Sequence, residues 1–387
     1  MMRLLYLLNI SNPDRLSADS GFTVAELLLP ALADLGADIT FAAPARVSDE
    51  RVWFERTALP GTKYRARFGA DAEQLAAIVG GARPDVVVVN QIEQAPAVRA
   101  ALLETGRTAL VAGYCHYLPF SVTDLGATHL DPSLDDAGLG PAVLLAFCAG
   151  LAACDRVLVH SAAASAWTLA VAERHGLDLG GRLAVVPPPR DERLVRDPAE
   201  AENGWGASLV GVYNHRLYRH YGTARFAELA SRLTAETSVR LRVTDLFGDR
   251  SAARVALDSS PEFHRAQLAA LPGVHVVSDD GDRARYRNLL AGAHFGIAPL
   301  RAGCPWSMSV IDCQAMGLPV IAPRMGWFAE HIDEELLFDS LDAAIDIARR
   351  LAGDEEFYRL HAKRAHAATT CLTPAVVAAA YWEAISR

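Results

Sequence analysis

The segment 294–323, HFGIAPLRAGCPWSMSVIDCQAMGLPVIAP, combines small, polar and acidic residues in a pattern that could bind an anion. It predicts a buried strand at His294–Pro299, a loop at Leu300–Pro305 and a short helix from about Ser307 to Met316, with a second strand at Leu318–Ala322. The first N–H groups of a helix have no partner within it. The loop and the helix start could therefore bind a diphosphate.

A second candidate site follows the strand predicted at Leu209–Asn214, in the sequence LVGVYNHRLYRHYG. Arg216 and Arg219 come just after the strand end, together with two histidines. An arginine can bind two phosphate oxygens at once and stabilise the charge of a leaving phosphate. A solvated loop of surface arginines is the structural alternative, and the downstream segment 294–323 favours phosphate binding.

The first half of the chain carries polar residues after several predicted strands. In ADSGFTV, Asp19 or Ser20 is a candidate helix cap, and Gly21 would let a substrate approach the backbone closely. Asn90 ends another strand and could line the side where an acceptor binds, and His116 lies just past a third. A helix cap and a buried structural histidine are the alternatives to a site here.

Two successive series of strands and helices are predicted to position these residues. Apolar runs such as DVVVVN are typical of parallel strands covered on both faces. The sequence thus predicts an α/β fold of two Rossmann-like domains, with ligands at the carboxyl ends of the strands and facing a shared cleft. The predicted strands are 3–10, 38–43, 85–90, 108–114, 156–160 and 183–187, then 209–214, 239–245, 273–278, 294–299 and 318–322. The predicted helices lie near 21–36, 72–80, 93–104, 141–153 and 162–175, then 223–236, 283–292, 307–316, 341–352 and 354–368.

Three consecutive prolines, followed by the charged stretch RDERLVRDPAEAEN, predict a linker between the two series. We therefore expect a first domain at 1–190, a second at 191–370, and a last helix at 371–387.

Composition narrows the possible functions. The length of 387 residues favours two domains, and no apolar run reaches the roughly 18–20 residues of a membrane span. The net charge of −9 disfavours a broad nucleic-acid surface. Six cysteines lack metal-ligand spacing, so we expect a cytoplasmic protein without a disulfide framework.

The segment 294–323 resembles the donor-binding signature of retaining nucleotide-sugar glycosyltransferases with two Rossmann-like domains (the GT-B fold, family-4-like). That signature is a glutamate, seven residues, and glutamate-alanine-methionine ahead of Gly-x-Pro-Val. Counting back from Gly-Leu-Pro-Val at 317–320 places Asp312 at the second glutamate and Cys304 at the first.

The loop after residue 214 resembles the same family. Its arginine-leucine pair is matched by Arg216-Leu217 and its later glycine by Gly222, whereas Tyr221 stands at the lysine position. Arg219 could supply that lysine's charge. The tetrapeptide YNHR is also similar to the tRNA-queuosine mannosyltransferases.

The resemblance implies a role for each residue. Asp312 would hold the nucleotide ribose, and a thiol at Cys304 would replace a carboxylate that binds sugar hydroxyls. Arg216 and Arg219 would bind the diphosphate, and His116 would lie beside the transferred sugar. The remaining expected donor-side residues are Asn214, Trp306, Ser307, Met308 and Ser309, and the acceptor-side residues are Ser20, Gly21 and Asn90.

The resemblance also implies retaining transfer without a metal or a cofactor, with a nucleotide diphosphate sugar as co-substrate. The acceptor is expected to be a small molecule bound by the first domain. The last helix would return to that domain. Two alternatives stay open: a nucleotide-sugar-binding partner subunit that has lost activity, indicated by Cys304 and Tyr221, and an RNA-modifying glycosyltransferase, indicated by YNHR.

Overall fold

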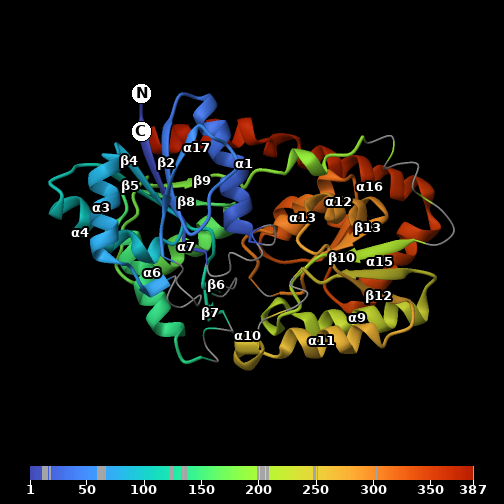
Figure 1. Ribbon diagram of the computed structural model, residues 1–387. Coiled ribbons are helices and arrows are strands. Elements are labelled where there is room, and N and C mark those ends of the chain that lie inside the picture. The colour runs from blue at the N-terminus through green and yellow to red at the C-terminus, as the bar shows by residue number, and fades with distance from the viewer. Residues whose placement is uncertain are drawn as a thin grey trace. The chain divides into compact units, whose positions relative to one another are not determined.

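The computed structural model describes residues 1–10, 16, 19–58, 67–122, 126–131, 134, 137–197, 200, 205, 209–246, 250, 252–301 and 303–386. The chain forms two compact units, one made of Met1–Pro189 with Pro374–Arg387 and the other of Arg190–Thr373. Each unit is an α/β unit built on a parallel sheet, as the sequence predicted (Figure 1). Among the described residues, no helix combines the length and apolar character that crossing a membrane requires.

The first unit contains a seven-stranded parallel sheet in the order β3-β2-β1-β4-β5-β8-β9. Because β1 lies between β2 and β4, the strand order reverses there, which is where open α/β sheets bind ligands. A small antiparallel hairpin, β6-β7, is separate from this sheet. The strands are β1 (Arg3–Leu7), β2 (Asp38–Ala43), β3 (Val52–Arg56), β4 (Val86–Val89), β5 (Leu110–Tyr114), β6 (Phe120–Val122), β7 (Thr128–Leu130), β8 (Arg156–Val159) and β9 (Leu183–Val185).

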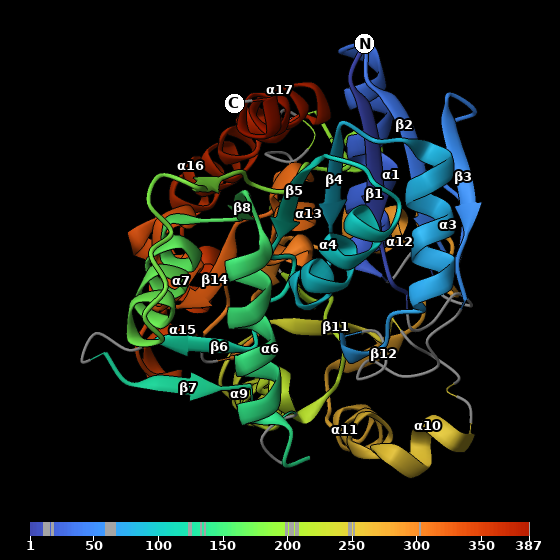
Figure 2. The same cartoon turned by 90° about the vertical axis from the view of Figure 1, so that its left-hand side faces the viewer.

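Helices cover both faces of this sheet. On one face α3, α4, α6 and α7 succeed one another as neighbours, and on the other α1 packs against α17 (Figure 2). The C-terminal helix thus returns to the first unit, as predicted. The helices are α1 (Ser20–Asp34), α3 (Ala72–Ala82), η2 (Ile92–Gln94), α4 (Ala95–Glu104), α6 (Gly140–Ala153), α7 (Ala162–Arg174) and α17 (Pro374–Ser386).

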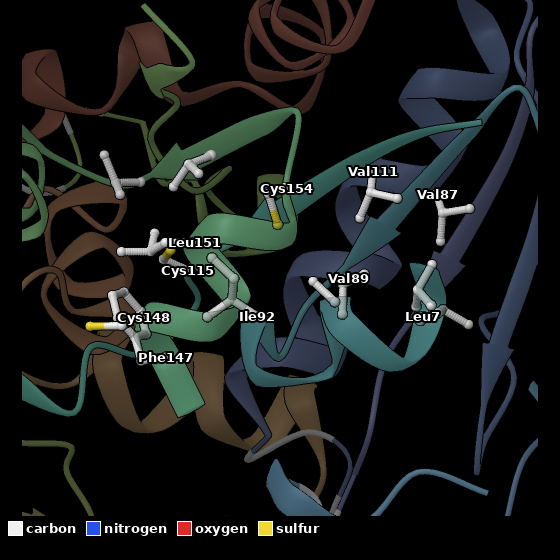
Figure 3. Packing of buried hydrophobic residues seen from close by; sticks show 14 of the residues in the cluster. Leu7, Val87, Val89, Ile92, Val111, Cys115, Phe147, Cys148, Leu151 and Cys154 are labelled. Carbon is white, nitrogen blue, oxygen red and sulfur yellow. The ribbon is translucent and has the colours of Figure 1, made fainter. Parts of the chain in front are cut away.

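Alternate valines of the central strands form the core beneath the first of these helix layers. Val87 and Val89 of β4 and Val111 of β5 pack with Phe147 and Leu151 of α6 (Figure 3). These side chains are at most 1% exposed. Burying such a side chain contributes about 1.5–3 kcal/mol, so the sheet gives a rigid base for the loops at its carboxyl edge.

The second unit has a six-stranded parallel sheet in the order β12-β11-β10-β13-β14-β15. Its strand order reverses between β10 and β13. The strands are β10 (Val210–Tyr213), β11 (Arg240–Thr244), β12 (Val274–Val277), β13 (Phe295–Ile297), β14 (Val320–Pro323) and β15 (Leu337–Phe338). The helices are η3 (Glu192–Leu194), η4 (Arg219–Tyr221), α9 (Thr223–Glu236), α10 (Ala252–Leu257), α11 (Ser260–Ala269), α12 (Arg283–Ala291), α13 (Met308–Ala315), α14 (Gly326–His331), η5 (Glu334–Leu336), α15 (Leu341–Gly353), α16 (Glu355–Ala368) and η6 (Thr370–Leu372).

The stretch expected to be a linker is only partly one. Asp191, the N-cap residue of the short helix η3, is 1% exposed, and Leu194, the last residue of that helix, is fully buried. The Arg190 N–H donates to the Leu372 carbonyl oxygen at 2.7 Å. Residues 190–195 therefore pack within the second unit, because paired charges and one leucine anchor a sequence whose composition resembles a solvated linker.

Candidate functional site

In the second unit, the carboxyl ends of β10 and β13 bring the predicted donor residues together. The two strands are parallel neighbours, with Val212 opposite Gly296. Asn214, His215 and Arg216 follow β10, and the loop that leads to α13 follows β13. Parallel strands end at the same edge of a sheet, so two loops far apart in sequence meet there.

Gly222 shows how closely the two loops approach. This residue ends η4 and precedes α9 in a left-handed conformation, with φ of 74°. A Cβ atom added here would lie 2.1 Å from the carbonyl oxygen of Leu300. Only glycine fits, because it alone combines a free choice of φ with no side-chain atom at this backbone crossing.

A hydroxyl–imidazole chain joins the β10 loop to the first turn of α13. His215 is hydrogen-bonded to Ser309, whose Oγ lies 3.0 Å from the Oγ of Ser307. Ser307 is the N-cap residue of α13, and its side chain does not cap the helix. The Ser307 side chain therefore leaves the first N–H groups of α13 uncapped, and such groups can bind an anion.

His215 is neutral in this site. Burial lowers its pKa to about 3, and the positive charges of Arg216 and Arg301 act in the same direction. Both guanidinium groups therefore lie close enough to act electrostatically on an imidazole that is bonded to the first turn of α13. The β10 loop, the β13 loop and the start of α13 together form one positively charged region.

Arg301 is the functional candidate that sequence reasoning missed. Its guanidinium carbon lies 5.5 Å from the ring centre of Tyr221, the residue at the family's lysine position. Arg219, the residue expected to replace that lysine, is exposed on η4, where its N–H donates to Ser260 Oγ at 3.2 Å. The place of Arg301 in the loop that follows a buried strand was the available signal.

Cys304 and Trp306 are buried in the loop that follows β13. The Cys304 Sγ donates to the Trp306 carbonyl oxygen at 3.1 Å, and the Cys304 carbonyl oxygen accepts from the Trp327 N–H at 3.3 Å. Burial raises the pKa of the thiol, although Arg301 acts to lower it. Cys304 is therefore a neutral group that fixes the loop. Met308, the first residue of α13, is half-buried.

Asp312, the expected ribose ligand, is 3% exposed on α13. Its Oδ2 accepts from the Tyr286 hydroxyl at 3.0 Å. That hydroxyl in turn accepts from Asn214 Nδ2 at 2.7 Å, and the same amide donates to the Ser309 carbonyl oxygen at 3.1 Å. Asn214 thus links the end of β10 to α12 and α13, so its observed contacts are structural.

In the first unit, two predicted residues are bonded to each other. Asp19 caps α1 by accepting from the Phe22 N–H at 2.9 Å, which leaves the Ser20 hydroxyl available for another partner. Ser20 Oγ lies 2.9 Å from His116 Nε2. The two come from the carboxyl ends of β1 and β5, which lie on either side of β4.

Asn90, at the end of β4, has an unused acceptor. It is 2% exposed, and its Nδ2 donates to the Tyr6 hydroxyl at 2.9 Å, whereas its Oδ1 is buried without a hydrogen-bond partner. A Cβ atom on Gly21 would lie 3.6 Å from that oxygen. A buried acceptor without a partner costs about 1–3 kcal/mol, so a ligand hydroxyl here would be stabilising.

A second histidine, His160, follows β8 and was not singled out from the sequence. Its ring centre lies 5.8 Å from that of His116 and 4.9 Å from that of Tyr114. Burial lowers its pKa well below the usual value, and His116 acts in the same direction. Each of four neighbouring strands, β1, β4, β5 and β8, is thus followed along the chain by one of these polar residues. Within the described residues, no three His, Cys, Asp or Glu side chains are grouped so that they could bind a metal ion.

The chain resembles solved glycosyltransferases over its whole length. HepE of Anabaena, solved with UDP and glucose, is 16% identical with a TM-score of 0.68, and the match covers 100% of both chains. A sucrose-phosphate synthase from Thermosynechococcus elongatus is 16% identical, with a TM-score of 0.72 and 98% of each chain covered. A UDP-forming trehalose-phosphate synthase from Burkholderia xenovorans is 14% identical, with a TM-score of 0.70 and 100% of this chain and 99% of the other covered.

No protein-family model and no curated protein sequence matches the chain. At these identities the similarity establishes the fold, which is the two-unit GT-B fold of nucleotide-sugar glycosyltransferases.

Proposed function

We propose that this protein is a retaining, metal-independent glycosyltransferase that uses a nucleoside diphosphate sugar. The observation that carries the proposal is the convergence of Arg216, Arg301 and the start of α13 around the neutral His215. A diphosphate leaving group gains negative charge as its bond to the sugar breaks. Fixed guanidinium and N–H groups that face it would stabilise that charge without a cation.

The roles within the second unit follow from this arrangement. Arg216 and Arg301 bind the diphosphate, with Arg219 at the exposed edge of the loop, and the N–H groups of Ser307, Met308 and Ser309 complete the anion site. Asp312 accepts the ribose hydroxyls, and Trp306 borders the sugar. These assignments draw on the resemblance of the two motifs and on the neighbouring positions of their loops.

In the first unit, the Ser20–His116 pair and the unused Asn90 oxygen would receive a hydroxyl group of the acceptor. Gly21 has no Cβ atom, which would otherwise lie 3.6 Å from the Asn90 oxygen. We propose a small hydroxylated molecule as the acceptor and the cytoplasm as the location. The YNHR tetrapeptide supports RNA as an alternative acceptor, and the net charge of −9 argues against it.

The first experiment is a thermal-shift screen with UDP, GDP, ADP and dTDP, because selective binding stabilises the folded state by mass action. A labelled sugar donor carrying the selected nucleotide is then incubated with wild type, Arg216→Ala and Arg359→Ala. Arg359 is an exposed arginine of α16 that pairs with Glu355, so its variant controls for the loss of one positive charge.

We expect Arg216→Ala to slow release of the labelled sugar by about 100- to 1,000-fold, the effect of losing a transition-state contact of about 2.7–4 kcal/mol. The Arg359→Ala control should match wild type. Equal rates in all three proteins would exclude Arg216 from the site. Retention of configuration is tested by NMR of the product anomer.

The second candidate is a nucleotide-sugar-binding subunit without activity. The neutral, buried Cys304 supports it, since a thiol bonded to the Trp306 carbonyl oxygen is a poor substitute for a carboxylate that binds sugar. Tight retention of the donor, with neither hydrolysis nor transfer, would favour this candidate over the enzyme.

A further inference from the structure

A buried network of ion pairs connects Asp312 to Arg283 and Asp191, and the sequence did not predict it. Arg283, the first residue of α12, donates through Nε to Asp191 Oδ2 at 2.8 Å and through Nη2 to Asp312 Oδ1 at 3.3 Å. The side chains of Asp191 and Asp312 are 0% and 3% exposed, and that of Arg283 is 18% exposed. The Arg283 guanidinium also lies 4.7 Å from the ring centre of Tyr286.

The negative charges of the two carboxylates, Asp191 and Asp312, are offset by neighbouring arginines to different extents. Burial acts to raise the pKa of Asp191, but Arg193 and Arg283 outweigh it, so this pKa is lowered. Burial also acts on Asp312, where Arg283 is the one cation that offsets it, and the pKa of Asp312 is raised. Asp312 therefore depends on Arg283 for its charge more than Asp191 does.

A buried ion network of this kind contributes little to stability, because the desolvation of its charges opposes their attraction. It can nevertheless fix an anion in one place. The Oδ1 and Oδ2 atoms of Asp312 each accept one bond in this chain, from Arg283 and Tyr286 respectively. A carboxylate has about four lone-pair positions, so each oxygen can still accept a ligand hydroxyl.

We infer that Arg283, held in place by Asp191, is a positioning residue that keeps Asp312 an ionised acceptor for ribose hydroxyls. The pair thereby sets the preference of the site for ribonucleotides over deoxyribonucleotides. This inference rests on the proposed function. Arg283 itself does not touch the nucleotide, and it acts through Asp312.

The ionisable groups that act on Asp312 in the described part of the chain lie on α12, just before η3 and on α13. Arg283 and Tyr286 come from α12, Asp191 precedes η3 and lies behind Arg283, and Cys313 follows Asp312 on α13. Burial raises the pKa of the Cys313 thiol, so it is neutral. Without Arg283, the charge nearest to Asp312 would be that of Asp191. A like charge together with burial raises a carboxyl pKa towards neutrality and above it.

The test compares the affinities of the ribo and 2′-deoxy forms of UDP, GDP and ADP, measured by calorimetry at about pH 6.5 and about pH 8.5. The two forms share the titrations of phosphate and base, so their ratio isolates the ribose contact. The variants are Arg283→Met, Arg283→Lys, and the matched control Arg193→Met, which removes an arginine that donates to Asp191 rather than to Asp312.

Wild type and Arg193→Met should prefer the ribo form by about 10- to 100-fold at both pH values, as expected for a hydrogen bond to a charged group. In Arg283→Met, the preference should fall to less than about 3-fold at the lower pH, because Asp312 is then protonated, and recover at the higher pH. Arg283→Lys keeps a cation and should restore the preference at both.

Other outcomes would refute either the positioning role of Arg283 or the proposed function on which it rests. A wild-type preference in Arg283→Met at the lower pH, or a loss that is the same at both pH values, would refute the positioning role. If none of the six nucleotides binds wild type, the proposed function itself is wrong. Should Arg283→Met fail to fold, the double variant Asp191→Asn/Arg283→Met removes both charges of the buried pair. Burial alone then raises the pKa of Asp312, so a smaller loss of preference at the lower pH is expected.

Discussion

Replacing Gly222 with alanine tests the close approach of the two loops at the candidate site. Alanine would first have to adopt a φ of 74°, which costs an L-residue about 1–2 kcal/mol. Its methyl group would also lie 2.1 Å from the carbonyl oxygen of Leu300, a backbone atom that cannot rotate away. Overpacking that forces a backbone shift costs about 1–3 kcal/mol, so we expect a total loss of about 2–5 kcal/mol.

The control is Gly273→Ala in the same unit. Gly273 has φ of 77°, but a methyl group there would meet the Thr234 side chain at 3.3 Å rather than a backbone carbonyl. Its substitution should cost about 1–2 kcal/mol, mostly from the backbone conformation. The difference between the two variants therefore isolates the effect of the loop contact.

The assay is thermal unfolding, together with the affinity for the nucleotide that the screen selects. In a unit of this size, 1 kcal/mol shifts Tm by about 2–4 °C, so Gly222→Ala should melt about 4–20 °C below wild type and Gly273→Ala about 2–8 °C below it. The nucleotide affinity should fall in Gly222→Ala alone, because the shift displaces Leu300 and Arg301. Equal melting temperatures and affinities in the two variants would refute the reasoning.

Two further predictions concern the donor site. If the wild-type site, with a thiol at Cys304, accepts a sugar with fewer hydroxyls, Cys304→Glu should raise turnover with common hexose donors. The prediction is contradicted if hexoses are already the best donors of wild type and the glutamate variant gives no gain with them. The pKa of His215 is lowered to about 3, chiefly by burial. Below about pH 6.5 the unfolded chain is protonated at this histidine, whereas the folded protein stays unprotonated there. The free energy of unfolding therefore decreases as the pH falls from about 6.5. Between about pH 6 and pH 4.5, the free energy of unfolding of His215→Gln should therefore fall less than that of wild type, by up to about 1.4 kcal/mol per pH unit. Denaturant titrations measure this difference. An equal fall in the two proteins would argue against a buried neutral imidazole.

The strands and helices that flank the donor site were predictable because each has a local signal. The helix expected at 307–316 is α13 at Met308–Ala315, and the strand expected at 294–299 is β13 at Phe295–Ile297. The edge strand β3 was missed, because it carries Trp53 with 66% exposure and does not show a buried, apolar pattern. The two-residue strand β15 and the helices α10, α11 and α14 were also missed, the last being only six residues long.

Apart from Arg301, the residues of the candidate donor site could be named from the sequence, but their hydrogen-bonding partners could not. Arg283 bridges two carboxylates that lie 92 and 29 positions away along the chain. Asn214 and Ser309 are 95 positions apart, yet a hydrogen bond joins them. Such pairs are set by the order of strands in the sheet, which local periodicity does not encode.

The last helix has a consequence for how the protein is made. Because α17 packs against α1, the first unit contains helices that are synthesised before and after the whole of the second unit. The second unit is contiguous in sequence, so its fold can be completed before α17 is synthesised. The first unit must wait for α17, and until then the α17-facing surface of α1 stays uncovered. A chain truncated before Pro374 would keep that surface exposed and is expected to recruit chaperones or to aggregate. Deletion of α17 should therefore impair the assembly of the first unit during biogenesis, while the second unit folds without it.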